Sequence, residues 1–186
     1  MATDDILLDT EDRMDKAIQH LKSGLGGIRT GRANPGLVDS LKVEVYGSLT
    51  PMKSLASVGA PEPQQILIRP YDPGTIKEIE RAIIGSGLGF APQNDGRVIR
   101  INVPPLTTDT RKKLVARIKE LTEEAKVSIR NVRRDGNKAV EQGEKDGDLT
   151  EDERDKCKDD IQELTKKYEG LCTDMAKKRE DEVMEG

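Results

Sequence analysis

Basic side chains gather in one stretch of the chain at a spacing that suits binding to phosphate. Residues 111–138 hold ten Lys or Arg against four acidic residues, a net charge of +6, although the 186-residue chain has a net charge of −4. On a helix of about 100° per residue, five of these cations lie within about 60° of one another. They form a basic ridge of Lys112, Lys119, Lys126, Arg130 and Arg133. Each cation that neutralises a phosphate releases counterions, so the basic ridge predicts contact with a nucleic-acid backbone.

A solvated helix face is the alternative explanation of the basic ridge, because many charge runs have no other role. Charge alone favours the solvated face. If the ridge does bind nucleic acid, the rest of the chain would orient the docking, because residues 139–186 hold nine bases against seventeen acids and would repel phosphate. No aromatic residue interleaves the ridge, which favours contact with RNA backbone and shape over base stacking. A helical adaptor that binds proteins through its charged faces stays open as a second function, and its binding would depend little on salt.

Other kinds of site are poorly matched. Gly26–Ala33 has the glycine spacing of a P-loop, but it ends in Arg-Ala where Lys followed by Ser or Thr is required. Asp146–Glu151 begins like a calcium loop, but Glu stands where Gly is needed. The single histidine, His20, has no nucleophile beside it in the sequence. Cys157 and Cys172 lie about 22 Å apart along one helix, too far for a disulfide. We therefore expect no enzyme activity, no metal and no cofactor.

Prolines and apolar spacing divide the chain into helical ends and a different middle. All nine prolines lie between Pro35 and Pro105. Both ends carry apolar residues at alternating spacings of four and three, as in amphipathic helices. The first seam is Met14, Ile18, Leu21, Leu25 and Ile28. The second begins with Leu114, Ile118, Leu121, Ala125, Ile129 and Val132. The third is Cys157, Ile161, Leu164, Tyr168, Leu171 and Met175. Three such seams bury one another in a three-helix bundle.

Capping residues place the ends of the two C-terminal helices. Thr107 is expected to cap a helix over residues 108–146. Thr150 and Glu153 form the T-x-x-E pattern of a capping box, which opens a helix over residues 150–184. A short turn joins these helices, so we expect antiparallel neighbours that are each about 50–60 Å long. Three glycines are expected to loosen the end of the first helix. They are Gly24, Gly26 and Gly27.

Residues 31–105 have the pattern of a small α/β domain. Alternating apolar residues predict strands over residues 41–46 and 98–103, and a short apolar run predicts another over residues 65–69. A helix is expected over residues 75–84, with Gly85 at its end. This domain interrupts the bundle between its first and second helices, so the chain crosses between the domains twice.

Membrane and targeting segments are not expected. No apolar run approaches the roughly 18 residues that a membrane span needs. The first five residues are acidic in balance, where a targeting peptide would be basic. We therefore expect a soluble, cytoplasmic protein without membrane contact.

Four segments of the sequence resemble the ribosome recycling factor family. They are Ile28–Pro35, Val43–Gly47, Val103–Thr107 and Val127–Asp135. The resemblance runs in order through essentially the whole chain. It implies an L-shaped α+β molecule, in which an elongated three-helix bundle carries a small β/α/β domain inserted between helix 1 and helix 2. Residues 1–30 and 106–186 would form the bundle, and residues 31–105 would form the inserted domain.

The same resemblance implies disassembly of the post-termination ribosome together with elongation factor G, with the bundle on large-subunit rRNA. It assigns RNA contacts to Arg29, Arg32, Arg111, Arg130 and Arg133. The basic ridge and its surroundings add Lys112, Lys119, Lys126 and Arg134. A hinge between the domains is expected at Thr30, Gly31, Pro104 and Pro105. The expected partners are the ribosome and elongation factor G, and we expect the chain to act as a monomer.

Overall fold

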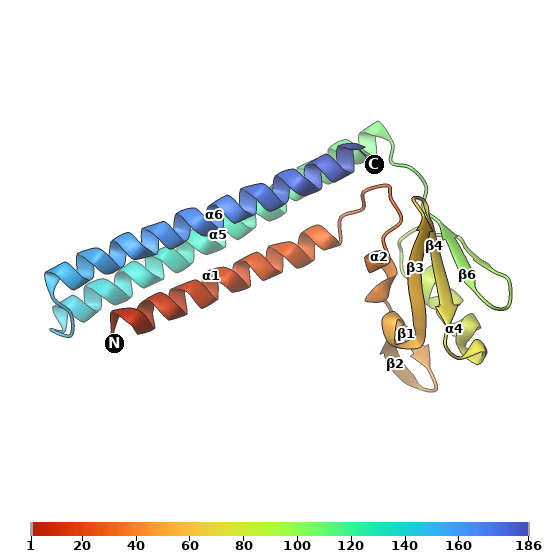
Figure 1. The fold of residues 1–186 in the computed structure, drawn as a ribbon, viewed down its shortest axis with the longest axis horizontal. Coiled ribbons are helices and arrows are strands. Elements are labelled where there is room, and N and C mark those ends of the chain that lie inside the picture. The colour runs from red at the N-terminus through yellow and green to blue at the C-terminus, as the bar shows by residue number, and fades with distance from the viewer. Residues whose placement is uncertain (1, 186) are drawn as a thin grey trace. The chain divides into compact units, whose positions relative to one another are not determined.

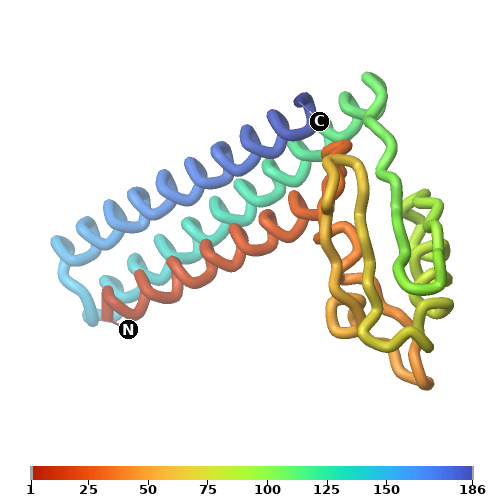
Figure 2. The backbone as a smooth tube through the Cα atoms, turned by 45° about the vertical axis from the view of Figure 1, so that its right-hand side comes forward, coloured from red at the N-terminus to blue at the C-terminus, as the bar shows by residue number. Residues whose placement is uncertain are grey.

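Two compact units make up the chain. The computed structural model describes residues 2–185, and it divides into one unit of Met1–Ile28 and Lys112–Glu182 and a second of Arg29–Arg111 and Val183–Gly186. The first unit contains helix α1 (Thr3–Gly26) and most of helices α5 (Thr108–Lys145) and α6 (Glu151–Glu185). Figures 1 and 2 show these three helices side by side, with α6 antiparallel to α5.

The ends of α5 and α6 lie within one residue of their predicted positions because the predicted caps form. The Thr107 hydroxyl oxygen accepts a hydrogen bond from the backbone N–H of Thr110 (3.2 Å). The Thr150 hydroxyl oxygen accepts one from the backbone N–H of Glu153 (3.2 Å), and the Glu153 carboxylate accepts one from the backbone N–H of Thr150 (2.8 Å). The predicted capping box is therefore confirmed. Helix α1 continues as far as Gly26, and its looser end stays a prediction.

The spacing of buried residues in α6 differs from the predicted seam. Leu171 is 38 % exposed, and the next residue, Cys172, is buried in its place. Ala176 is likewise buried where the predicted seam had Met175. The buried series is Cys157, Ile161, Thr165, Tyr168, Cys172 and Ala176. Its spacings of four, four and three form an 11-residue repeat, which is close to the natural period of an α-helix. Because Thr165 counts as polar, the alternation of four and three in the sequence followed the wrong phase.

Each helix of the bundle has one buried threonine whose hydroxyl makes a hydrogen bond within its own helix. Each hydroxyl donates to the carbonyl oxygen four residues earlier, Thr10 to Ile6 (2.7 Å), Thr122 to Ile118 (2.6 Å) and Thr165 to Ile161 (2.8 Å). A buried hydroxyl without a partner would be costly. These threonines therefore serve as small core residues that need no partner on another helix.

The second unit contains a four-stranded antiparallel sheet and a separate hairpin. The sheet has the order β3 (Ala56–Glu62), β4 (Gln65–Pro70), β6 (Ile99–Asn102) and β5 (Pro92–Asn94). The hairpin pairs β1 (Lys42–Val45) with β2 (Ser48–Pro51). The short helices are α2 (Gly36–Asp39), α3 (Met52–Leu55), η1 (Pro73–Thr75) and α4 (Ile76–Gly85). The strands and the helix that the sequence predicted are β1, β4, β6 and α4.

The core of the second unit is rich in isoleucine. Six isoleucines from the sheet and α4 are fully buried together: Ile66, Ile68, Ile79, Ile83, Ile99 and Ile101. In β6 the buried and exposed residues alternate, so one face of the sheet carries the core. Strands β3 and β5, which the sequence did not predict, form the two edges of the sheet and contain proline. Proline is tolerated in edge strands, and it hides their pattern in the sequence.

Gly136 allows the three helices of the first unit to approach closely, and this can be tested. A Cβ atom at Gly136 would lie 3.0 Å from the Thr10 hydroxyl oxygen and 3.1 Å from Cδ1 of Ile161. Gly170 on α6 is exposed and faces open space. We expect Gly136→Ala to lower the free energy of unfolding by about 1 kcal/mol, because overpacking outweighs the gain in helix propensity. Gly170→Ala should raise it by up to about 1 kcal/mol. Urea unfolding of both variants measures the difference, and equal gains would contradict the close packing.

The capping box of α6 predicts a pH dependence of stability. The backbone N–H of Thr150 and then its hydroxyl donate to the Glu153 carboxylate and hold its pKa below the ordinary value. The carboxylate therefore adds stability above the unfolded pKa of about 4.3, and this contribution is lost as the pH falls through the lower folded pKa. We expect Glu153→Gln to lower Tm at neutral pH and to match the unsubstituted chain in acid. Glu151→Gln, in the same turn, is the control and should have a smaller effect at neutral pH.

Candidate nucleic-acid interface

The basic ridge lies along α5 beside the line of its buried residues, and part of the ridge borders α6. Ile118 and Ile129 of α5 are fully buried, and the ridge residues are exposed or half-buried. Lys112 and Lys119 are exposed, whereas Arg133 is half-buried. The predicted placement of the ridge outside the core of the bundle agrees with these exposures.

Arg130 is the ridge residue whose side chain is already bound by carboxylates of the bundle. Its guanidinium donates to the carboxylate of Glu123 on α5 (3.0 Å) and to that of Glu169 on α6 (3.1 Å). The hydrogen bond that Arg130 donates to Glu123 is the main reason that the pKa of Arg130 is raised above its ordinary value, and the bond to Glu169 adds to it. The Arg130 charge is therefore already paired inside the first unit.

Ion pairs between α5 and α6 fix how these helices face each other. The pairs are Glu144 with Arg154 (3.6 Å), Glu141 with Lys158 (2.6 Å) and Arg130 with Glu169 (3.1 Å). Each step toward the start of α5 matches a step toward the end of α6, as antiparallel helices require. These pairs give the register of α5 and α6 around Arg130 and between it and Glu144.

This register leaves two ridge residues without a facing carboxylate. It places Lys166 opposite Arg133, and Lys166 pairs with Glu163 on its own helix (3.5 Å). It places Thr173 opposite Lys126, and both residues line one groove between α5 and α6. Among residues 2–185, neither Arg133 nor Lys126 has a hydrogen-bond or ion-pair partner for its side chain.

The predicted RNA-binding residues thus fall into two groups. Six have no side-chain partner within residues 2–185, and we call them the free cations: Arg32, Lys112, Lys119, Lys126, Arg133 and Arg134. Arg29, Arg111 and Arg130 do not belong to this group. Arg29 donates to the carbonyl oxygen of Pro104 (2.6 Å), Arg130 binds two carboxylates, and Arg111 is half-buried in the first turn of α5. Free cations can bind phosphate without breaking an existing interaction.

Sequence reasoning missed the partners that divide these groups. Glu169 lies 39 residues from Arg130, and Pro104 lies 75 residues from Arg29. No spacing in the sequence links residues so far apart, because their proximity depends on how the helices and chain crossings pack. The facing register of α5 and α6 was the missing information.

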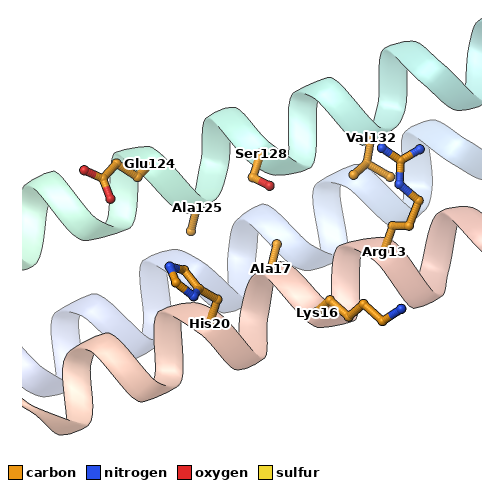
Figure 3. A pocket seen from close by; sticks show the side chains of 8 residues that line it. All are labelled: Arg13, Lys16, Ala17, His20, Glu124, Ala125, Ser128 and Val132. Carbon is orange, nitrogen blue, oxygen red and sulfur yellow. The ribbon is translucent and has the colours of Figure 1, made fainter.

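A groove between α1 and α5 brings His20 close to polar residues of α5. Its volume is about 510 Å³, and Figure 3 shows His20 on α1 and Glu124 and Ser128 on α5 among its lining residues. Sequence reasoning found no nucleophile beside His20, whereas the structure places Ser128 along the same groove. Within the described chain no hydrogen bond joins His20 to Ser128 or Glu124. A base activates a nucleophile through a hydrogen bond, and none is formed between His20 and Ser128 in this structure.

The described residues show neither a cluster of metal ligands nor a membrane-spanning helix. No group of three or more His, Cys, Asp or Glu residues within residues 2–185 is arranged to hold a metal ion. Cys157 and Cys172 are free and buried, and burial raises the pKa of both thiols. None of the described helices is long and apolar enough to cross a membrane.

The predicted hinge residues lie in irregular backbone. Thr30 and Gly31 lie between α1 and α2, and Gly31 has a φ of 77°, which glycine adopts without strain. Pro104 and Pro105 lie between β6 and α5 and are exposed. Their position between regular elements is compatible with a hinge, which stays a prediction.

Comparisons with known proteins show what the chain is similar to. The family model described as ribosome recycling factor matches residues 21–184. The ribosome-recycling factor of Rhodopirellula baltica is 72 % identical over 140 residues, which cover 75 % of each chain. That of Shouchella clausii is 48 % identical over 183 residues, which cover 98 % of this chain and 99 % of the relative.

Solved structures agree with the sequence relatives. A solution structure of the ribosome recycling factor has a TM-score of 0.82 and 38 % identity, over 99 % of this chain and 98 % of that one. A second, described as models of the Thermus thermophilus ribosome recycling factor and the E. coli elongation factor G bound to the E. coli post-termination complex, has a TM-score of 0.70 and 38 % identity, over 98 % and 99 %. These matches confirm the α+β fold class and the resemblance seen in four sequence segments. The chain therefore belongs to the ribosome recycling factor family.

Proposed function

We propose that this chain disassembles the post-termination ribosome together with elongation factor G, and that the free cations anchor it on the RNA of the large subunit. Membership of the family supports the first part, as does the similar structure that is described on a post-termination complex with elongation factor G. The observation that carries the second part is the set of free cations, since the bundle neutralises Arg130 and leaves its ridge neighbours unpaired.

Phosphate suits the basic ridge better than a protein partner does. Protein interfaces have a core of buried apolar and aromatic side chains. Among the described residues of α5, Val127 is the one large hydrophobic side chain with high exposure, at 44 %. The exposed face of α5 therefore offers charge to an RNA backbone and little apolar surface for a protein partner to bury. The adaptor function is therefore the less supported alternative.

The division into two units suggests how the chain would act. Residues 1–30 and 106–186 would form a stiff anchored domain, because three long helices bury one seam along their length. Residues 31–105 would form the domain that elongation factor G pushes about the hinge at Thr30, Gly31, Pro104 and Pro105. The energy would come from nucleotide hydrolysis by the partner, and one copy of this chain would suffice for each ribosome.

The anchoring role of the free cations can be tested by salt dependence. We expect Arg133→Ala to weaken ribosome binding and to reduce the slope of log affinity against log salt by about 0.7–0.9, the contribution of one phosphate contact. Arg117→Ala, on the same helix, is the control because Arg117 already pairs with Glu120 (2.9 Å). Arg130→Ala should have a smaller effect than Arg133→Ala. Equal slopes for Arg133→Ala and Arg117→Ala would remove the basis for the RNA-binding ridge.

Subunit splitting tests the function as a whole. Post-termination ribosomes mixed with elongation factor G and GTP should split, as followed by light scattering, only when this chain is also present. Arg133→Ala should require a higher concentration for the same rate, because the change weakens anchoring. Tight ribosome binding without splitting would contradict the partner or the hinge, and absence of binding would favour the adaptor alternative.

A further inference from the structure

The two chain crossings that leave the second unit are attached to one turn. The outgoing crossing is residues 29–33, and the backbone N–H of Ala33 donates to the carbonyl oxygen of Pro63 (2.6 Å). The returning crossing is residues 103–107, and the backbone N–H of Val103 donates to the carbonyl oxygen of Gln64 (2.8 Å). Pro63 and Gln64 are the adjacent residues of the turn between β3 and β4. Both crossings are therefore held at the same place in the second unit.

Arg29 joins the crossings directly. Its Nη2 atom donates to the carbonyl oxygen of Pro104 at 2.6 Å, so a side chain of the outgoing crossing holds the backbone of the returning one. The guanidinium carbon lies 5.9 Å from the centroid of the Phe90 ring, within reach of a cation–π interaction. Phe90 is buried in the core of the second unit. The Arg29 charge therefore acts inside the second unit.

A second arginine holds the residue just before Arg29, within the first unit. Nη2 of Arg179 on α6 donates to the carbonyl oxygen of Ile28 (2.7 Å). Its Nη1 atom donates to the carboxylate of Glu182 (2.6 Å), which orients the guanidinium. The Arg179 side chain is only 16 % exposed. Ile28 is thus fixed to α6, while the next residue is fixed to the returning crossing.

Few constraints act between these anchors. In the described part of the chain, the backbone groups of residues 29–32 make no hydrogen bond to other backbone. Gly31 lies in this short stretch with a φ of 77°. On the returning crossing, Pro105 and Leu106 lie between the anchored Pro104 and the capping residue Thr107. Residues 30–32, between the anchored Arg29 and Ala33, are therefore the part of the outgoing crossing where we infer that bending occurs.

We propose that Arg29 is a positioning residue that fastens the two crossings into one pivot, and that it is not an RNA contact. Two crossings held together can turn about a shared axis, whereas two separate crossings also permit twisting. Arg179 holds Ile28, the residue before the pivot, against α6 of the first unit. The inference rests on the proposed hinge, and it replaces the RNA contact that the sequence predicted for Arg29.

Arg29→Gln and Arg32→Gln form a matched pair for the test, because they make the same change three residues apart. Arg32 is exposed and is one of the free cations. We expect Arg29→Gln to speed hydrogen exchange of the Ala33 and Val103 amides about tenfold, the factor expected when one charge-assisted hydrogen bond is lost. Amide relaxation by NMR should show more independent tumbling of the two units. The salt slope of ribosome binding should not change.

Arg32→Gln should show the opposite pattern. Its amide exchange and relaxation should match the unsubstituted chain, and its salt slope should fall by about 0.7–0.9. If Arg29→Gln instead lowers the salt slope like Arg32→Gln and leaves exchange and relaxation unchanged, Arg29 is an RNA contact and the proposal is wrong. Phe90→Leu is a second variant that should speed the same amides less strongly, and no change in their exchange would also count against the pivot.

These outcomes separate the pivot from the proposed function. Faster exchange in Arg29→Gln together with unchanged salt slopes in both Arg32→Gln and Arg133→Ala would support the pivot and overturn RNA anchoring. Unchanged exchange in Arg29→Gln together with a reduced salt slope in Arg133→Ala would overturn the pivot and support RNA anchoring.

Discussion

The close approach of three helices at Gly136 is the contact on which the first unit depends. The Thr10 hydroxyl oxygen and a methyl group of Ile161 lie 3.0 and 3.1 Å from the position that a Cβ atom would take, so α1 and α6 both pack against the backbone of α5. The chain has no tryptophan, and Tyr168 is the one buried tyrosine of the described residues. Aliphatic and small side chains therefore fill the bundle, and they pack at the density of a protein interior only if the helices lie close together.

Close packing of α5 and α6 also decides which charges are available. Because the two helices keep one register, the α5 cations that border α6 lie opposite identifiable residues of that helix. Glu169 faces Arg130 and binds it, whereas Lys126 faces Thr173 and Arg133 faces Lys166. A net charge counted along the sequence treats all of these cations alike. The packing separates cations that stabilise the bundle from cations that can bind another molecule.

The sequence predicted the features that depend on local chemistry. The ends of α5 and α6 could be predicted because Thr107 and Thr150 act on backbone groups within three residues. The phase of the buried residues in α6 could not be predicted, because threonine is counted as a polar residue. The Thr165 hydroxyl is nevertheless bonded within its own helix, so the residue can be buried. Strands β3 and β5 were not predicted, because their prolines indicate a loop in the sequence. Proline is tolerated in these strands because they lie at the edges of the sheet. The partners of Arg29 and Arg130 depend on contacts across tens of residues.

The two arginines of the segment Ile28–Pro35 show why residue type alone does not assign a role. Arg29 and Arg32 are three residues apart, and on a helix they would share a face. Helix α1 ends at Gly26, and the positive φ of Gly31 turns the backbone between them. One guanidinium consequently meets the carbonyl oxygen of Pro104, and the other has no partner in the described chain. The end of α1 and the turn at Gly31 thus give two arginines of one segment different surroundings, and this difference is the basis of the different roles proposed for them.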